Sequence, residues 1–255
     1  MKSGEQAVLY VVCTPIGNLG DISQRALEVL GCVDAMACED TRHSRRILDH
    51  HGLARPPILF ACHEHNEKAA AQRILGLLRD GRSVALVSDA GAPGVNDPGY
   101  RVISAAVEAG LPVRVIPGPS AVITALLASG PPTAGFVFKG FPPRKSGQRR
   151  SLLETEAERP ETLIFFESPH RLAGLLADAA AALGDRPAAV CLELTKLHER
   201  VVRGSLPELA ADFADQKVKG EATVVIAGQS RKEAQEKKRA RAREKRQARQ
   251  ERQEA

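Results

Sequence analysis

Two loops rich in glycine and proline carry polar side chains and follow apolar, strand-like segments. They read TPIGNLGD at 14–21 and SDAGAPGVNDPG at 88–99. Glycines allow the backbone to approach a ligand closely. Asp89, at the exit of an apolar segment, could accept a hydrogen bond from a cofactor amine or offset a positive sulfonium. The second loop could equally be a structured turn in which Asp97 caps the next helix.

Two further loops combine turn residues with chemically active side chains. In PGPSA at 117–121, Gly118 permits close approach, and Ser120 precedes a helix whose first N–H groups could face a polar ligand. The run FESPHR at 166–171 places a carboxylate, a hydroxyl, an imidazole and a guanidinium together. Glu167 and Arg171 could also form a purely structural pair.

Two polar segments, EDTR at 39–42 and HEHNE at 63–67, end two other apolar segments. His63 and His65 have the spacing of metal ligands, but no third ligand with a convincing motif accompanies them. The sequence therefore predicts no metal, and polar residues that face substrate or solvent.

The elements that must position these loops alternate between strand-like and helix-like segments. In the first half, strands are expected at 7–13, 33–38, 57–61, 83–87 and 112–116, and helices at 23–30, 41–50, 67–79 and 100–109. This alternation is typical of an α/β domain with a mostly parallel sheet. Ligands of such sheets collect at the carboxyl ends of the strands, where the loops lie.

The second half follows a Pro/Gly-rich junction near Gly118 and has a different order. Helices are expected at 121–128, 149–158, 171–183 and 206–214, strands at 135–140, 162–166, 188–194, 199–204 and 222–227, and a basic loop at 141–148. Strands that follow one another without a helix imply a mixed sheet with an antiparallel part. We therefore expect two α/β domains, 7–117 and 118–229, with a cleft between them.

The positive charge of the 255-residue chain is concentrated at its end. The net charge is +5, yet residues 231–255 hold eleven Lys or Arg against five Glu, so the rest is close to neutral. The tail at 230–255 contains no apolar residue except alanine, which predicts disorder or a fraying helix. It could contact RNA phosphates through counterion release, or only improve solubility.

The composition also indicates in which cellular compartment the protein is found. The five cysteines are scattered without a CxxC pair, which favours reduced thiols used as small apolar residues. No apolar run approaches the roughly 18 residues that cross a membrane, and residues 1–6 lack the pattern of a signal peptide. We expect a cytoplasmic protein.

Taken together, the motifs resemble one known family. The runs TPIGNL, CEDTR, SDAGAPGVNDPG, PGPSA, FFESPHR and KGEATVVIAG occur in order between about Val8 and Gly228. They are similar to the bacterial ribosomal RNA small-subunit methyltransferase I family, which has the tetrapyrrole methylase fold of the class III methyltransferases.

The resemblance implies a homodimer that binds S-adenosylmethionine between its two domains. The implied reaction is methylation of the 2′-hydroxyl of cytidine 1402 in the 16S rRNA of the small ribosomal subunit. By position, the residues implied to contact the cofactor are Pro15, Asp89, Gly91, Ser120 and Ala121, with Ala222 and Thr223 on the adenine side.

Methyl transfer to a hydroxyl is an in-line displacement in which orientation supplies much of the catalysis. A general base helps, because a ribose hydroxyl is a poor nucleophile until its proton is drawn off. The candidates for the base are Glu167 and Asp40, followed by Glu39 and His170. Expected contacts to RNA phosphates are Arg42, Lys139, Arg144, Lys145 and Arg171, with the basic loop at 142–150 as a gripping arm.

Two alternatives stay open. A small-molecule methyltransferase of the same fold, acting on corrinoids or other tetrapyrroles, would ignore ribosomal subunits. A non-enzymatic ribosome-assembly factor that binds RNA through its tail would not bind S-adenosylmethionine.

Overall fold

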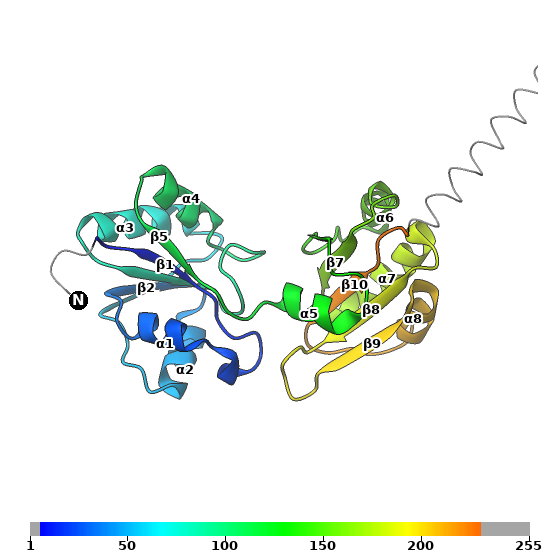
Figure 1. Cartoon of the computed structure of the whole chain (residues 1–255), viewed down its shortest axis with the longest axis horizontal. Helices are drawn as coiled ribbons and strands as arrows, with labels where there is room; N and C mark the ends of the chain where they lie inside the picture. Colours follow the sequence, from blue (N-terminus) through cyan, green and yellow to red (C-terminus); the bar gives the residue numbers. More distant parts are fainter. Residues whose placement is uncertain (1–5, 231–255) are drawn as a thin grey trace, which may run out of the picture. The chain divides into compact units, whose positions relative to one another are not determined.

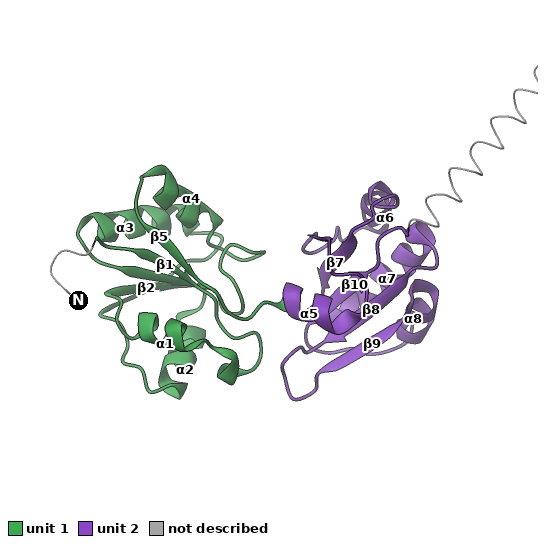
Figure 2. Ribbon diagram, viewed as in Figure 1, with its two compact units in different colours: residues 1–121 green, residues 122–255 purple. Residues whose placement is uncertain are grey.

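The structure is a computed structural model that describes residues 6–230. The chain forms two compact units that divide between Ala121 and Val122 (Figure 2). The tail predicted at 230–255 lies, apart from its first residue, outside the described residues.

Unit 1 contains a five-stranded sheet in the order β3-β2-β4-β1-β5, in which every neighbouring pair is parallel. Strands β1, β2 and β5 of this sheet are labelled in Figure 1. Its strands are β1 (Leu9–Val12), β2 (Ala35–Cys38), β3 (Ile58–Ala61), β4 (Val84–Val87) and β5 (Val113–Ile116). Its helices are η1 (Leu19–Asp21), α1 (Gln24–Leu30), α2 (Thr41–His50), α3 (Glu67–Arg79) and α4 (Tyr100–Glu108).

Helices cover both faces of this sheet, and the strand residues alternate between the two resulting cores. Ala35 and Ala37 of β2 pack into the core that includes α3 and α4. Met36 and Cys38 pack into the opposite core, with α1 and α2. All four residues of β2 are buried, as expected for a parallel strand covered on both sides.

The chain leaves the carboxyl ends of β2 and β4, which are neighbours, in opposite directions. After β2 it passes through α2 to β3 at one side of the sheet, and after β4 it passes through α4 to β5 at the other side. α2 and α4 also lie on opposite faces. Such a switch point leaves a crevice at the carboxyl edge, the usual ligand site of open α/β sheets.

Unit 2 contains a mixed sheet in the order β6-β7-β10-β8-β9, in which only β6 and β7 are parallel. Its strands are β6 (Phe136–Phe138), β7 (Thr162–Glu167), β8 (Pro187–Leu192), β9 (Arg200–Ser205) and β10 (Ala222–Ile226). Its helices are α5 (Ala121–Ser129), α6 (Ser146–Thr155), α7 (Pro169–Leu183) and α8 (Leu206–Phe213). The predicted two-domain α/β fold, with an antiparallel part in the second sheet, is confirmed.

One predicted element is displaced. The basic loop expected to reach Arg150 ends at Lys145, because α6 begins at Ser146 rather than Arg149. The first turn of α6 is fixed to Asp178 of α7, to which the Ser146 hydroxyl donates at 2.9 Å and Nε of Arg149 at 2.8 Å. Arg149 is consequently buried and is not part of a free gripping arm. None of the helices within residues 6–230 is long and apolar enough to span a membrane.

Candidate functional site

The first two glycine-rich loops of unit 1 are bonded to each other at the carboxyl edge of the sheet. The N–H of Thr14 donates to the carbonyl of Gly91 at 2.8 Å, and the N–H of Gly91 donates back at 3.0 Å. The Thr14 hydroxyl also donates to the carbonyl of Ser88 at 3.1 Å. Gly91 has φ +77°, a conformation that favours glycine. The loops after β1 and β4 thus form one unit.

The third loop packs against this pair. A Cβ added to Gly118 would lie 3.0 Å from Cβ of Cys13, which is tighter than an ordinary contact, so the glycine helps the loop after β5 to come this close. A Cβ on Gly91 would lie 3.9 Å from the carbonyl oxygen of Pro119. The loops that carry Pro15, Asp89, Gly91 and Ser120 therefore converge, and α5 begins at Ala121 directly after them.

Asp89 joins this cluster to the end of β2. Its Oδ1 accepts the backbone N–H of Asp40 at 3.0 Å. The backbone N–H of Asp89 in turn donates to the carboxylate of Glu39. These reciprocal bonds hold the carboxyl ends of β2 and β4 together at the switch point, with two acidic side chains beside the three converging loops.

Glu39 has an environment that suits proton transfer. Burial raises the pKa of Glu39, and so does the negative charge of Asp89, whereas the hydrogen bond from Asp89 and the charge of His63 act in the opposite sense. His63 follows β3, next to β2, and no group among residues 6–230 makes a hydrogen bond to its buried Nδ1. Burial raises the pKa of the neighbouring Cys62 to about 11, so that thiol stays neutral.

Asp40 is engaged in a structural role. It is the N-cap of α2, and its Oδ1 accepts the N–H of Arg42 at 2.7 Å. The Arg42 guanidinium binds the same carboxylate through Nε at 3.1 Å and Nη2 at 2.7 Å. Hydrogen bonds from Arg42 lower the pKa of Asp40 to about 2, which makes it a weak base at neutral pH.

Sequence reasoning missed the residue that holds the end of the 88–99 loop. The N-cap residue of α4 is Gly99 rather than Asp97. The buried carboxylate of Glu67, in the first turn of α3, instead accepts the N–H of Gly99 at 2.8 Å and that of Arg101 at 2.9 Å. A contact 32 residues away in sequence leaves no local signal, although Glu67 ends the polar segment HEHNE.

In unit 2, Glu167 forms the structural pair that the sequence allowed. Its side chain is 0% exposed, and Oε1 lies 2.5 Å from Nη2 of Arg171 and accepts the N–H of Ser168 at 2.7 Å. Burial raises the pKa of Glu167, against the effect of these partners. Its Oε2 is also buried and has no hydrogen-bond partner within the described chain.

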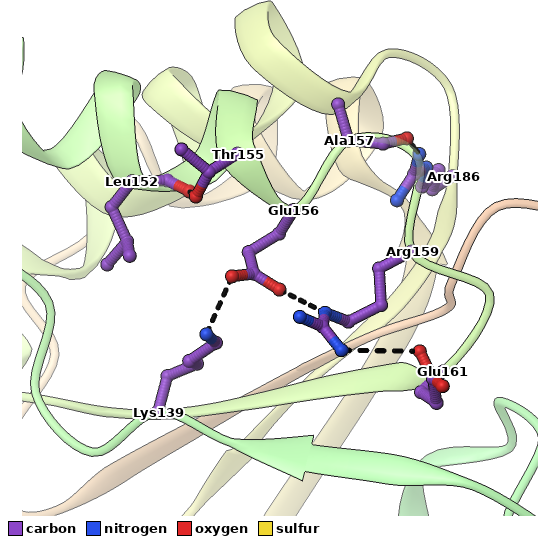
Figure 3. A network of polar contacts seen from close by, with 8 residues as sticks. All are labelled: Lys139, Leu152, Thr155, Glu156, Ala157, Arg159, Glu161 and Arg186. Atoms are coloured by element: carbon purple, nitrogen blue, oxygen red, sulfur yellow. Dashed lines mark hydrogen bonds and ion pairs between the residues drawn. The ribbon is translucent and has the colours of Figure 1, made fainter.

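The unit 2 residues that are predicted to contact RNA phosphates differ in whether their side chains are exposed or already paired with a carboxylate. Lys139 is held in a polar network, with its Nζ 2.6 Å from Oε1 of Glu156, and Glu156 also binds Arg159 (Figure 3). Arg144 and Lys145 are exposed on the loop before α6. Lys139 is therefore occupied by a nearly buried carboxylate, while the other two face solvent.

The remaining expected contacts lie at the start of β10. Ala222 pairs in register with Glu167 of β7, so β10 begins beside the FESPHR loop, and Ala222 and Thr223 are buried. Their contact with a cofactor stays a prediction. Within residues 6–230, no three His, Cys, Asp or Glu side chains cluster as metal ligands would.

Comparison with known proteins identifies the family of this chain. Residues 8–210 match the family model of the tetrapyrrole (corrin/porphyrin) methylases. The ribosomal RNA small subunit methyltransferase I of Micromonospora olivasterospora is 52% identical over 89% of this chain and 72% of its own length. That of Mesorhizobium japonicum is 48% identical over 91% and 78%. A uroporphyrin-III C-methyltransferase of Thermus thermophilus, solved with S-adenosylhomocysteine, has a TM-score of 0.59 at 21% identity, covering 87% of this chain and 97% of that one. The chain belongs to the ribosomal RNA small subunit methyltransferase I family, within the tetrapyrrole methylases.

Proposed function

We propose that this protein transfers a methyl group from S-adenosylmethionine to the 2′-hydroxyl of cytidine 1402 in 16S rRNA. The observation that carries the proposal is the convergence of the loops after β1, β4 and β5 beside Asp89, at the switch point of unit 1. The names of the relatives support rRNA as the acceptor. A homodimer and a cytoplasmic location are parts of the same proposal.

The residues of unit 1 fit S-adenosylmethionine chemically. Backbone groups of the converging loops offer donors and acceptors for its polar parts, and the glycines keep the surface free of side chains. The carboxylate of Asp89 offsets positive charge on an ammonium or sulfonium group. S-adenosylmethionine supplies an activated methyl group, and a same-fold structure was solved with its demethylated product.

Among the candidate bases, Glu39 suits the reaction best. A base works most efficiently when its pKa approaches the working pH, and burial together with Asp89 moves the pKa of Glu39 in that direction. The Glu39 carboxylate would take the proton of the ribose hydroxyl while the ribose oxygen attacks the methyl carbon. The carbon–sulfur bond breaks at the same time and leaves a neutral thioether.

Asp40 and Glu167 have other roles in this proposal. Asp40 caps α2 and pairs with Arg42, and Glu167 fixes Arg171. Hydrogen bonds from Arg42 favour the ionised form of Asp40 and oppose proton uptake. Burial raises the pKa of Glu167, as it does for Glu39, but the Glu167 carboxylate is already paired with Arg171. Arg144 and Lys145 are the phosphate contacts that we retain, because they are exposed, and the basic tail adds charge.

The direct test is an assay with S-adenosylmethionine labelled in its methyl group. Small ribosomal subunits that lack the modification should accept label, whereas a tetrapyrrole acceptor should not. Label on the tetrapyrrole alone would favour the small-molecule alternative. Absence of S-adenosylmethionine binding in calorimetry would favour the assembly factor.

A further inference from the structure

An exposed aromatic ring lies at one edge of the unit 2 sheet. Phe141, which is 51% exposed, follows Lys139 and Gly140 in the loop after β6. Its ring centroid lies 5.9 Å from that of Phe166 at the end of β7, with the planes at 62°. The guanidinium carbon of Arg171 lies 6.0 Å from the Phe141 centroid. Because β6 and β7 are parallel, their following loops leave the sheet at the same edge.

The backbone under this ring is firmly held. The N–H of Phe166 donates to the carbonyl of Gly140 at 3.0 Å. Farther along the loop, Nη1 of buried Arg149 donates to the carbonyl of Arg144 at 3.3 Å. Arg149 is itself anchored by Asp178, whose carboxylate lies 2.5 Å from Nη2. The loop is therefore ordered before any partner arrives, which lowers the entropic cost of binding.

Arg149 has room for this role because the facing position on α7 is a glycine. A Cβ on Gly174 would lie 3.1 Å from Nη2 of Arg149. The buried guanidinium thus reaches both the carboxylate of Asp178 and the loop carbonyls. An unpaired buried charge would be costly, so the ion pair and the loop position depend on each other.

The surroundings of the ring are positively charged. Residues 139–150 contain five Lys or Arg and no Asp or Glu. Arg144, Lys145 and Arg150 of this run are exposed, and so is His170 on the neighbouring loop. Three acidic side chains border this run, and each is paired with a cation: Glu156 with Lys139, Glu167 with Arg171, and Asp178 with Arg149 and Arg150.

We infer that Phe141, Arg144, Lys145 and Arg171, the Phe141 platform, form a binding surface for single-stranded RNA. One base stacks on the exposed ring, and neighbouring phosphates contact Arg144 and Lys145, while Arg171, paired with Glu167, lies against the ring. Aromatic and guanidinium planes recognise unpaired bases, which a duplex does not offer. The identification of this RNA as rRNA rests on the proposed function.

The test measures RNA binding without methyl transfer. A fluorescein-labelled, cytidine-rich single-stranded RNA is titrated with the full-length protein, and fluorescence anisotropy gives the dissociation constant. Phe141→Leu keeps an apolar side chain but removes the stacking surface. We expect it to weaken binding roughly 5- to 150-fold, the range for loss of one stacked base. Phe141→Tyr should bind like wild type.

Two controls define the outcome. Phe136→Leu changes a ring that is 40% exposed at the start of β6, the strand that precedes Phe141, and it should leave RNA binding unchanged. The double variant Arg144→Gln/Lys145→Gln should lower the slope of log affinity against log salt by about 0.7 for each lost phosphate contact.

Unchanged RNA binding by Phe141→Leu would overturn the platform. The platform would also be overturned if Phe141→Leu changed the oligomeric state in sedimentation and left RNA binding intact, because the surface would then be a protein interface. A wild-type protein that binds the RNA but methylates nothing would contradict the proposed function instead, since the binding assay does not depend on catalysis.

Discussion

The backbone N–H of Asp40 donates to Oδ1 of Asp89 at 3.0 Å and thereby joins the carboxyl ends of β2 and β4. The reciprocal bond runs from the N–H of Asp89 to the carboxylate of Glu39. These bonds place one candidate cofactor residue and one candidate base at the point where the sheet reverses its winding. We propose a different role for each of these three acidic residues: cofactor binding for Asp89, proton transfer for Glu39 and helix capping for Asp40.

Asp89→Asn tests the negative charge of Asp89 separately from the hydrogen bond that its side chain accepts from the N–H of Asp40. The amide oxygen can still accept the N–H of Asp40, but the negative charge is lost. We expect a dissociation constant for S-adenosylmethionine roughly 10- to 100-fold higher, the effect of one charged hydrogen bond, and a nearly unchanged melting temperature. Calorimetric titration checks this, with Asp80→Asn, an exposed carboxylate at the end of α3, as the control. Unchanged affinity would remove Asp89 from the cofactor site.

Glu39→Gln tests the base. We expect kcat to fall about 10²- to 10⁴-fold while the affinity for S-adenosylmethionine is kept. In the wild type, kcat should rise with pH through the pKa of Glu39. Because that pKa is raised above its usual value of 4.5, the half-maximal rate should lie above pH 4.5. The glutamine variant should lack this acidic limb, and a limb that persists would assign it to another group.

The groups that face Glu39 set the pH at which the acidic limb of the kcat profile lies. They are Asp89, Asp40, His63 and the neutral thiol of Cys62. His63→Asn removes a charge that lowers the pKa of Glu39, so the acidic limb should move to higher pH. A limb that moves to lower pH would contradict the assigned environment.

Asp40→Asn should leave turnover close to wild type, because asparagine is also a good N-cap and Asp40 is not the proposed base. The ion pair with Arg42 lowers the pKa of Asp40 to about 2. Its stabilising effect is therefore complete above the usual carboxyl pKa of 3.8 and is lost as the pH falls toward 2. Denaturation of both proteins across this range should show their stability difference shrinking with acidification. A large loss of kcat in this variant would restore Asp40 as the base.

Glu167→Gln should act on stability rather than on chemistry. It leaves Arg171 without its charged partner and should lower the free energy of unfolding by about 2–3 kcal/mol, less than for a fully buried pair because Arg171 keeps access to solvent. Urea denaturation measures the loss, and Glu154→Gln, at an exposed carboxylate of α6, is the control. A stable variant with kcat reduced a hundredfold would mean that Glu167 takes part in catalysis.

Gly118→Ala tests the convergence of the loops. The added Cβ, 3.0 Å from Cβ of Cys13, must push the loops after β1 and β5 apart. Overpacking of this kind costs about 1–3 kcal/mol, and we expect weaker binding of S-adenosylmethionine as well. Gly110→Ala is the control, since it has φ +66° and open space. It should cost stability through backbone strain but leave the affinity unchanged. Equal affinity in both variants would contradict the site.

Strand and helix periodicity was sufficient to predict the two-domain fold from the sequence. The bounds of α2 and α3 agree with the predicted helices at 41–50 and 67–79, which follow Asp40 and Asn66, two residues of types that favour the N-cap position. α6 begins three residues earlier than predicted. Its first turn contains a glycine and polar residues that read locally as a loop, and a contact to Asp178 from another helix makes it helical.

The loops of the candidate site could be predicted from the sequence, but the role of each residue in them could not. Glycines and prolines after strands marked the loops that the structure joins at Thr14 and Gly91. The role of each residue depends on hydrogen bonds between segments that are distant in the sequence, and such bonds leave no pattern in the local sequence. Glu67 holds the start of α4 from α3, and Asp89 changes the proton affinity of Glu39 across two strands.

The most direct test of the central claim maps the product nucleotide. Small ribosomal subunits lacking the modification are incubated with the protein and S-adenosylmethionine labelled in its methyl group, and the 16S rRNA is digested and analysed by mass spectrometry. We predict a single 2′-O-methylcytidine at position 1402, which should be absent with Glu39→Gln. Methylation on a base, at another nucleotide or at none, by protein that binds S-adenosylmethionine, would contradict the proposed reaction.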